Sequence, residues 1–234
     1  ILASLLTAGP VPMRTLYHLP VSPFCRKIRI VLAEKKLDAD LVTEPIWQRR
    51  QEFLALNPAG LVPVLVEESG RVLADSMAIA EYLEEIHGDP NLLPFDAAGR
   101  AETRRLTAWF DEKFHAEVTR PQIGEKLYKR LSGGGAPDSA SVRAATQNIL
   151  THLDYIGHLA ERRNWLAGEL FSLADIAAAA HLSAVDYVGG VPWDHNQEAR
   201  TWYARVKSRP SFRSLLADHL PGLPPPAHYA DLDF

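Results

Sequence analysis

The chain has 234 residues, of which 47% are hydrophobic and 23% are charged, an ordinary composition for one large globular domain or two smaller ones. Its net charge of −4 argues against nucleic-acid binding, because a nucleic-acid-binding face needs an excess of basic residues. The single cysteine excludes an internal disulfide, and the sequence contains no structural-zinc ligand set, so we expect a metal-free protein of the reducing cytoplasm.

The opening segment, ILASLLTAGPVP, is apolar but lacks the basic start of a secretory signal. It is also shorter than the roughly 20 residues that span a bilayer. We therefore expect no membrane insertion. We treat residues 1–12 as an artificial extension or an over-long gene start, and we expect the fold to begin at Met13.

Short β-rich and amphipathic segments alternate over residues 13–90, which we predict to be the first domain. The predicted strands begin at Thr15 and continue with residues 38–46, 62–68 and 71–75, and the predicted helices are residues 25–36 and 76–88. The order is strand, helix, strand, an irregular stretch, then two strands and a helix. This order predicts a small α/β layer.

Helical patterns dominate the rest of the chain, beyond a predicted linker over residues 91–100. We predict an all-α domain over residues 101–220, with one long helix that begins near Ser139. Ser172 and Asp175 match a capping box at the start of an alanine-rich helix. The run Ala177–Ala180 permits close approach of other helices, so we expect this helix to be buried.

The chain ends in a proline-led tail over residues 221–234. Three consecutive prolines enforce a stiff, extended backbone, and the tip carries four aromatic and acidic side chains, namely Tyr229, Asp231, Asp233 and Phe234. Two interpretations remain open. The tip serves as a recognition peptide, or the tail folds back and packs on its own domain.

Three local features contain candidate site residues. VSPFC places Ser22 and Cys25 where a strand meets a helix, NPAGLVPVL places Pro63 before a strand, and LADSMAIAEYL places Asp75 and Ser76 at a helix start. Each alone is typical of an ordinary cap or turn. Together with SLADIAAAA they resemble the glutathione S-transferase superfamily. The resemblance implies a thioredoxin-like N-terminal domain, an α-helical C-terminal domain and a homodimer.

The resemblance also implies catalytic roles. Ser22 occupies the position of the catalytic serine or cysteine, where a hydroxyl donates a hydrogen bond to the glutathione sulfur and stabilises the thiolate beside a helix N-terminus. Cys25 has the spacing of the second cysteine in a CxxC pair, but Ser22 removes the redox partner. Tyr17 is a rival for the catalytic role, since some branches use a tyrosine near the end of the first strand.

Glutathione binding is implied for a second set of residues. Val62, before a cis Pro63, pairs with the cysteinyl backbone, while Asp75 and Ser76 hold the γ-glutamyl group. Two departures predict weak binding. Many members carry Glu where Asp75 stands, and many carry Lys or Gln where Leu61 stands, so this chain lacks one polar contact and shortens another.

A narrower resemblance covers the whole chain from Met13. The segments WQRRQEFLALNPAG, WFDEKFHAEVT and HYADLDF are similar to a branch of bacterial cell-division proteins that bind the tubulin-like GTPase FtsZ. In that branch the fold is reused as a dimeric scaffold recruited to the division site. The partner-binding candidates are Trp47, as an exposed aromatic anchor, and the four tail residues Tyr229, Asp231, Asp233 and Phe234. The alternative for Trp47 is that its side chain covers the sheet or the domain interface.

Two functions of different classes follow. The first is a division regulator that binds FtsZ filaments as a dimer, with glutathione chemistry weak or lost. The second is an active glutathione S-transferase that acts on an unidentified electrophile. Because function depends on the site and not on the fold, the fold does not choose between them. The tail and the departures at Leu61 and Asp75 favour the first function, whereas Ser22, Val62 and Ser76 keep the second open.

Overall fold

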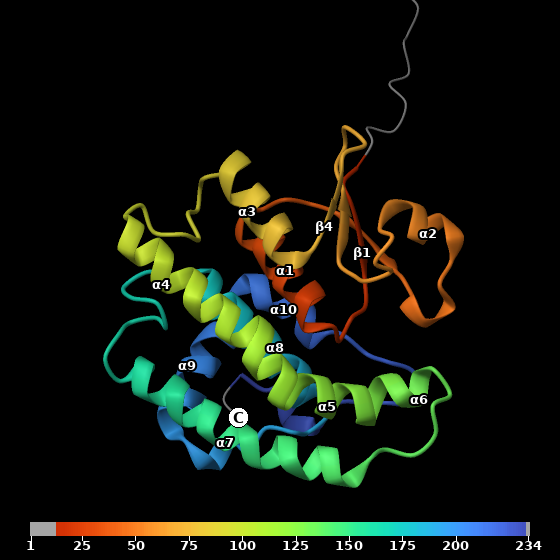
Figure 1. The fold of residues 1–234 in the computed structure, drawn as a ribbon. Coiled ribbons are helices and arrows are strands. Elements are labelled where there is room, and N and C mark those ends of the chain that lie inside the picture. The colour runs from red at the N-terminus through yellow and green to blue at the C-terminus, as the bar shows by residue number, and fades with distance from the viewer. Residues whose placement is uncertain (1–12, 233–234) are drawn as a thin grey trace, which may run out of the picture.

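The computed structural model describes residues 13–232. The predicted extension over residues 1–12 and the tail residues Asp233 and Phe234 lie outside the described residues. A small sheet with its helices forms one part of the molecule, and a larger set of helices forms the other (Figure 1). The predicted fold class, an α/β domain followed by an all-α domain, is confirmed.

Four short strands form one mixed sheet in the order β2-β1-β3-β4. The strands are β1 (Thr15–His18), β2 (Asp40–Thr43), β3 (Val64–Val66) and β4 (Val72–Ala74). Strand β1 pairs in parallel with β2 and antiparallel with β3, and β3 pairs antiparallel with β4. Leu16 and Leu65 lie opposite each other in the middle of this sheet and are fully buried, so the central strand pair contributes directly to the core.

The helices of the first domain pack on this sheet. They are α1 (Pro23–Glu34), α2 (Gln51–Leu56) and α3 (Ser76–Ile86), with a 3-10 turn η1 (Ile46–Gln48) before α2. Helices α1 and α3 pack against each other. The peptide bond between Val62 and Pro63 is cis, as predicted, and it leads directly into β3.

The second domain is helical throughout. Its longer elements are α4 (Ala97–Ala108), η2 (Trp109–Thr119), η3 (Gly124–Tyr128), α7 (Ser139–Ala160), α8 (Leu173–Tyr187) and α9 (Gln197–Lys207). The shorter ones are α5 (Arg120–Ile123), α6 (Lys129–Leu131), η4 (Trp193–His195), η5 (Pro210–Phe212), α10 (Arg213–Leu216) and η6 (Ala227–Tyr229). The predicted all-α character is present, but the helix that begins with α4 changes to π-helical geometry at Trp109.

Helix α8 lies at the centre of the second domain. Ser172 and Asp175 form the predicted capping box, and all 15 residues of the helix are buried. The carboxylate of Asp175 also accepts hydrogen bonds from the Leu166 amide at 2.9 Å and from the Trp202 indole at 3.0 Å. The cap therefore fixes the preceding loop and α9 as well as the helix itself.

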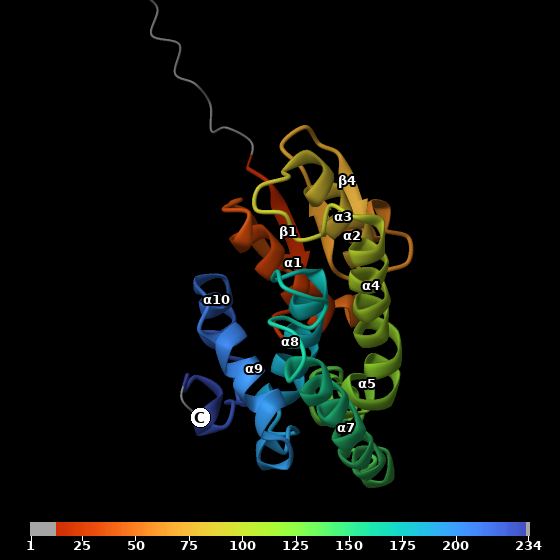
Figure 2. The ribbon, with the colours of Figure 1, turned by 90° about the vertical axis from the view of Figure 1, so that its left-hand side faces the viewer.

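Buried ion pairs join the two domains along α1, which packs on α8 (Figure 2). Arg26 and Arg29 both pair with Asp218, at 3.2 Å and 2.8 Å, and Lys27 pairs with Asp111 of η2. All three basic side chains are less than a tenth exposed. Since a buried charge without a partner is costly, these contacts hold the domains in one arrangement.

Candidate functional site

Ser22 caps the N-terminus of α1 and is buried. Its Oγ accepts a hydrogen bond from the Cys25 amide at 3.4 Å, and only 5% of the residue is exposed. The phenol of Tyr128, from η3 of the helical domain, lies against it. Burial raises the pKa of Tyr128, and a hydrogen bond to Ser22 opposes that rise. The hydroxyl that the resemblance assigns to glutathione therefore has partners within the protein.

Cys25 is also buried and is not placed for chemistry. It is 0% exposed, and its Sγ accepts a hydrogen bond from the Leu19 amide at 3.4 Å. Burial raises the pKa of the thiol to about 11, although hydrogen bonds from Ser22 and Leu19 oppose the rise. Because the thiolate is the nucleophile, Cys25 behaves as a small buried hydrophobic residue.

We expect Cys25 to resist thiol reagents in the folded protein. In the time that a maleimide needs at neutral pH to label the urea-unfolded protein completely, the native protein should stay unlabelled. The reason is that the thiol of the folded protein is both protonated and inaccessible. Mass spectrometry gives the labelled fraction. The control is the double variant Cys25→Ala, Ser69→Cys, whose exposed thiol should react at once. Rapid native labelling of Cys25 would contradict this burial.

Tyr17, the rival catalytic residue, lies on β1. Its ring centroid is 5.8 Å from that of Phe53 in α2, and the residue is half-buried. Neither Tyr17 nor Ser22 is among the residues that line the two hollows described next. The three predicted catalytic residues therefore do not meet in an open site.

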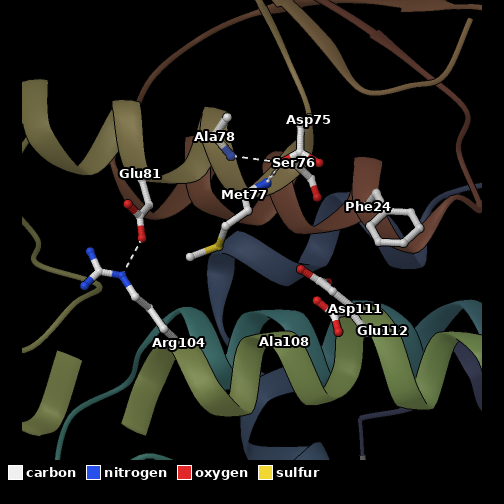
Figure 3. A pocket seen from close by; sticks show the side chains of 10 residues that line it. All are labelled: Phe24, Asp75, Ser76, Met77, Ala78, Glu81, Arg104, Ala108, Asp111 and Glu112. Carbon is white, nitrogen blue, oxygen red and sulfur yellow. Dashed lines mark hydrogen bonds and ion pairs between the residues drawn. The ribbon is translucent and has the colours of Figure 1, made fainter. Parts of the chain in front are cut away.

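The predicted glutathione-binding residues do meet, in a crevice with two adjacent hollows. The first, about 300 Å³, is lined by Phe24, Asn57, Ala59, Leu61, Val62, Pro63, Ala74, Asp75 and Ser76. The second, about 520 Å³, lies between the domains and is lined by Phe24, Asp75, Ser76, Met77, Ala78, Glu81, Arg104, Ala108, Asp111 and Glu112 (Figure 3). Phe24, Asp75 and Ser76 line both hollows, so the two lie next to each other.

Asp75 has an unusual conformation at the start of α3. Its φ is 76°, a region that few residues other than glycine adopt, although aspartate tolerates it better than most. Its Oδ1 accepts hydrogen bonds from the amides of Met77 at 2.8 Å and Ala78 at 3.0 Å (Figure 3). The carboxylate thus caps its own helix, as the residues before a helix often do.

The crevice departs at three residues from the contacts that the resemblance implies for glutathione. The Ser22 hydroxyl is buried beside Tyr128 and lines neither hollow. The carboxylate of Asp75 is held by its own helix, and Leu61, which is 59% exposed, offers no polar group. The four predicted glutathione-binding residues nevertheless all line the smaller hollow, namely Val62, Pro63, Asp75 and Ser76.

Several residues of this site were not predicted from the sequence. Phe24, which lies between the hollows, directly follows the Ser-Pro pair, and Asp111 and Glu112 face α3 from the helical domain (Figure 3). The adjacent acidic residues in the segment WFDEKF are the sequence feature that could have indicated Asp111 and Glu112. No sequence feature indicates Tyr128, because its contact with Ser22 depends on how the two domains pack.

The tail is packed up to Tyr229, as in the second of the two interpretations left open by the sequence. Tyr229, one of the partner-binding candidates, is 0% exposed, and its hydroxyl donates to the Leu215 carbonyl at 3.0 Å. The tail returns to α9, where Lys207 Nζ donates to the His228 carbonyl at 3.1 Å and to the Asp231 carbonyl (Figure 2). Apolar side chains around Tyr229 and the buried Lys207 hold the tail in this position. No local sequence pattern indicates these contacts.

The other partner-binding candidates that the structure describes lie at the surface. Trp47, in η1, is 37% exposed, and Asp231 lies in an exposed segment that continues to Leu232, itself 36% exposed. Asp233 and Phe234 lie beyond the described residues. Within residues 13–232, no helix is both long and apolar enough to cross a membrane, and no group of three metal-binding side chains comes together.

Comparison with known proteins gives consistent matches. The family model "Glutathione S-transferase, N-terminal domain" matches residues 16–91, and "Glutathione S-transferase, C-terminal domain" matches residues 139–205. FtsZ-localized protein A of Caulobacter vibrioides is 50% identical over 94% of this chain and 98% of its own length. Two solved structures each match 95% of this chain and 100% of their own. One is a glutathione S-transferase from Rhodospirillum rubrum F11, 56% identical with a TM-score of 0.94, and the other is FzlA from C. crescentus, 49% identical with a TM-score of 0.92.

Proposed function

The chain belongs to the glutathione S-transferase family, and on that premise we propose that it is a cell-division protein that binds FtsZ filaments as a homodimer, with weak or lost glutathione activity. The observation that carries the proposal is the 50% identity to FtsZ-localized protein A over nearly the full length of both chains. We place the protein in the cytoplasm, recruited to the division site.

The geometry around Ser22 supports a binding role over catalysis. A transferase of this family needs a hydroxyl or thiol that reaches the glutathione sulfur, whereas Ser22 is buried beside Tyr128 and Cys25 is protonated. A dimer presents each surface twice, so one molecule can bridge two filaments with a gain in avidity. Trp47 and Asp231 are the described residues that we assign to the partner surface.

Co-sedimentation with polymerised FtsZ tests the proposal. We expect the protein to pellet with FtsZ filaments in the presence of GTP and to stay in the supernatant without them. Trp47→Ala and Asp231→Lys should each reduce the pelleted fraction, the latter with a changed dependence on salt. Asp194→Lys, a charge reversal at a fully exposed residue elsewhere, is the matched control. Light scattering gives the oligomeric state, and failure of the parent protein to pellet would refute the proposal.

An active glutathione S-transferase is the second candidate. The Rhodospirillum rubrum structure that carries this name is 56% identical with a TM-score of 0.94. Val62 and Ser76 also line the crevice as catalysis would require. Against it stand the buried Ser22 and the occupied carboxylate of Asp75.

We expect calorimetry to find glutathione binding that is absent or weaker than about 1 mM, which corresponds to roughly −4 kcal/mol. The missing contacts at Leu61 and Asp75 remove about one or two charged hydrogen bonds, each worth about 1.5–3 kcal/mol. The double variant Leu61→Lys, Asp75→Glu restores both family residues and should bind more tightly than the parent. Micromolar binding by the parent, with Ser22-dependent conjugation of a test electrophile, would favour the enzyme.

A further inference from the structure

Two segments on one side of the molecule present apolar side chains to solvent. Phe95, between α3 and α4, is 84% exposed, and Leu170, shortly before α8, is 62% exposed. These are the two most exposed large hydrophobic residues in the described part of the chain. Ile86, the last residue of α3, is 47% exposed. Single exposed apolar residues are common on protein surfaces, whereas a group of them marks an interaction site.

The two segments lie side by side. The Leu173 amide donates to the Leu92 carbonyl at 2.9 Å, and this hydrogen bond joins the start of α8 to the segment that carries Phe95. In Figure 1 both segments lie on the left, which is the side that faces the viewer in Figure 2. We call the three exposed side chains of this side the loop patch, namely Ile86, Phe95 and Leu170.

The segment that carries Phe95 is held in a fixed position. The amides of Leu92 and Leu93 donate to Oε1 of the buried Glu84 at 2.9 Å and 3.1 Å. The buried ammonium of Lys35 pairs with the other oxygen of Glu84 at 2.7 Å. Because a segment that is already fixed loses little conformational freedom on binding, Phe95 is preorganised to contact a partner.

The charges around the loop patch are mainly negative. Arg162 and Arg163, which precede Leu170, are each paired with a glutamate. Within residues 85–100 and 161–171, Arg100 is then the one lysine or arginine without an ion pair to a described residue. The same two segments carry four exposed carboxylates that form no ion pair with a described residue, namely Glu85, Asp89, Asp96 and Glu169.

From the loop patch and its acidic surroundings we propose that this face binds a basic amphipathic segment of a second protein. The apolar residues of that segment contact Phe95 and Leu170, where burial of apolar surface adds to affinity. Its lysines or arginines lie against Glu85 and Asp89, so the charges are complementary. The same acidic residues oppose an anionic membrane surface, which attracts basic segments.

The loop patch is separate from Trp47, which we assign to the FtsZ surface. Helix α2, which follows the turn that carries Trp47, lies on the opposite side of the molecule from the start of α4 (Figure 1). One molecule can therefore hold both partners at once, as an adaptor that joins a second protein to the filament. The adaptor role rests on the proposed function, whereas binding at the loop patch does not.

Fluorescence anisotropy with two labelled peptides and the full chain tests the proposal. The first peptide contains leucine and lysine at helical spacing, so one face is apolar and the other basic, and the second has glutamate in place of every lysine. At physiological ionic strength we expect the glutamate peptide to bind at least about tenfold more weakly, because like charges would face each other. Since FtsZ is absent, failure of this binding is distinguishable from failure of the proposed function.

Four variants locate the binding. Phe95→Ala removes the central apolar contact and should weaken the lysine peptide by about tenfold, whereas Leu41→Ala, at a 48% exposed residue of β2, should leave it unchanged. Glu85→Lys should weaken it by about fivefold. Asp194→Lys, at a fully exposed residue elsewhere, is the control for charge reversal. The melting temperature should stay unchanged in Phe95→Ala, because an exposed side chain contributes little to the core.

Several outcomes would overturn the proposal. They are no binding of the lysine peptide at submillimolar concentration, equal affinity for the two peptides, full affinity in Phe95→Ala, or an equal loss in the two control variants. If Phe95→Ala turned a dimer into a monomer in light scattering, the loop patch would be a contact between two copies of this chain. If the parent but not Phe95→Ala bound phosphatidylglycerol vesicles, the loop patch would be a membrane contact.

Discussion

A Tyr229→Ala protein should unfold about 6–20 °C below the parent. The side chain is fully buried, its ring packs perpendicular to Tyr187 with the centroids 5.4 Å apart, and the Arg26 guanidinium lies 5.8 Å from the ring centroid. Removal of a buried aromatic side chain costs about 3–5 kcal/mol, and in a chain of this size 1 kcal/mol shifts the melting temperature by about 2–4 °C. Differential scanning calorimetry measures the shift.

Two controls separate packing from other effects. Tyr229→Phe keeps the ring and removes only the hydrogen bond to the Leu215 carbonyl, so it should cost about 1 kcal/mol. Deletion of residues 231–234 keeps Tyr229 and should leave the melting temperature nearly unchanged, while FtsZ binding falls. If Tyr229→Ala melted with the parent, the packed tail would be wrong. If the deletion melted many degrees lower, the last four residues would be structural and not a recognition segment.

Asp218→Ala should lower the free energy of unfolding by about 3–5 kcal/mol, because the loss of one partner leaves buried charges without compensation. Two guanidinium groups depend on this carboxylate. Arg26, which is 0% exposed, donates to Oδ2 at 3.2 Å, and Arg29 donates to the same atom at 2.8 Å. Urea unfolding, followed by circular dichroism, measures the change.

The matched control is another aspartate in an ion pair. Asp194 lies 3.6 Å from Arg200, and its side chain is fully exposed. Exposed pairs contribute little because water and salt screen them, so Asp194→Ala should leave the free energy of unfolding almost unchanged. If Asp218→Ala and Asp194→Ala lowered the free energy of unfolding equally, burial of the ion pairs along α1 would not be what stabilises the domain interface.

Local sequence signals predicted the features that depend on neighbouring residues. The capping box needs only Ser172 and Asp175, which are three residues apart, and it is present. The cis bond before Pro63, which the family resemblance implied, is present as well. The order of strands and helices followed in the same way from short periodic patterns. What the patterns did not predict is that Asp175 also receives a hydrogen bond from Trp202, on another helix.

The candidate site was predicted less completely, for a physical reason. Val62, Asp75 and Ser76 lie near one another in the chain, and they do line one crevice. The surroundings of Ser22 depend instead on Tyr128, and those of Tyr229 on Arg26 and Leu215. Such contacts arise only when segments far apart in the chain pack together, so no local sequence pattern indicates them.

The alanine run of α8 constrains how this protein can diverge. Four consecutive residues cover more than one helical turn of 3.6 residues, and Ala177–Ala180 are all 0% exposed. A larger side chain at any of them therefore has no outward direction and must displace a packed neighbour. During evolution, one of these alanines can be replaced by a larger residue only after a neighbouring side chain has become smaller. Substitutions at these positions must therefore come in compensating pairs, and they accumulate slowly.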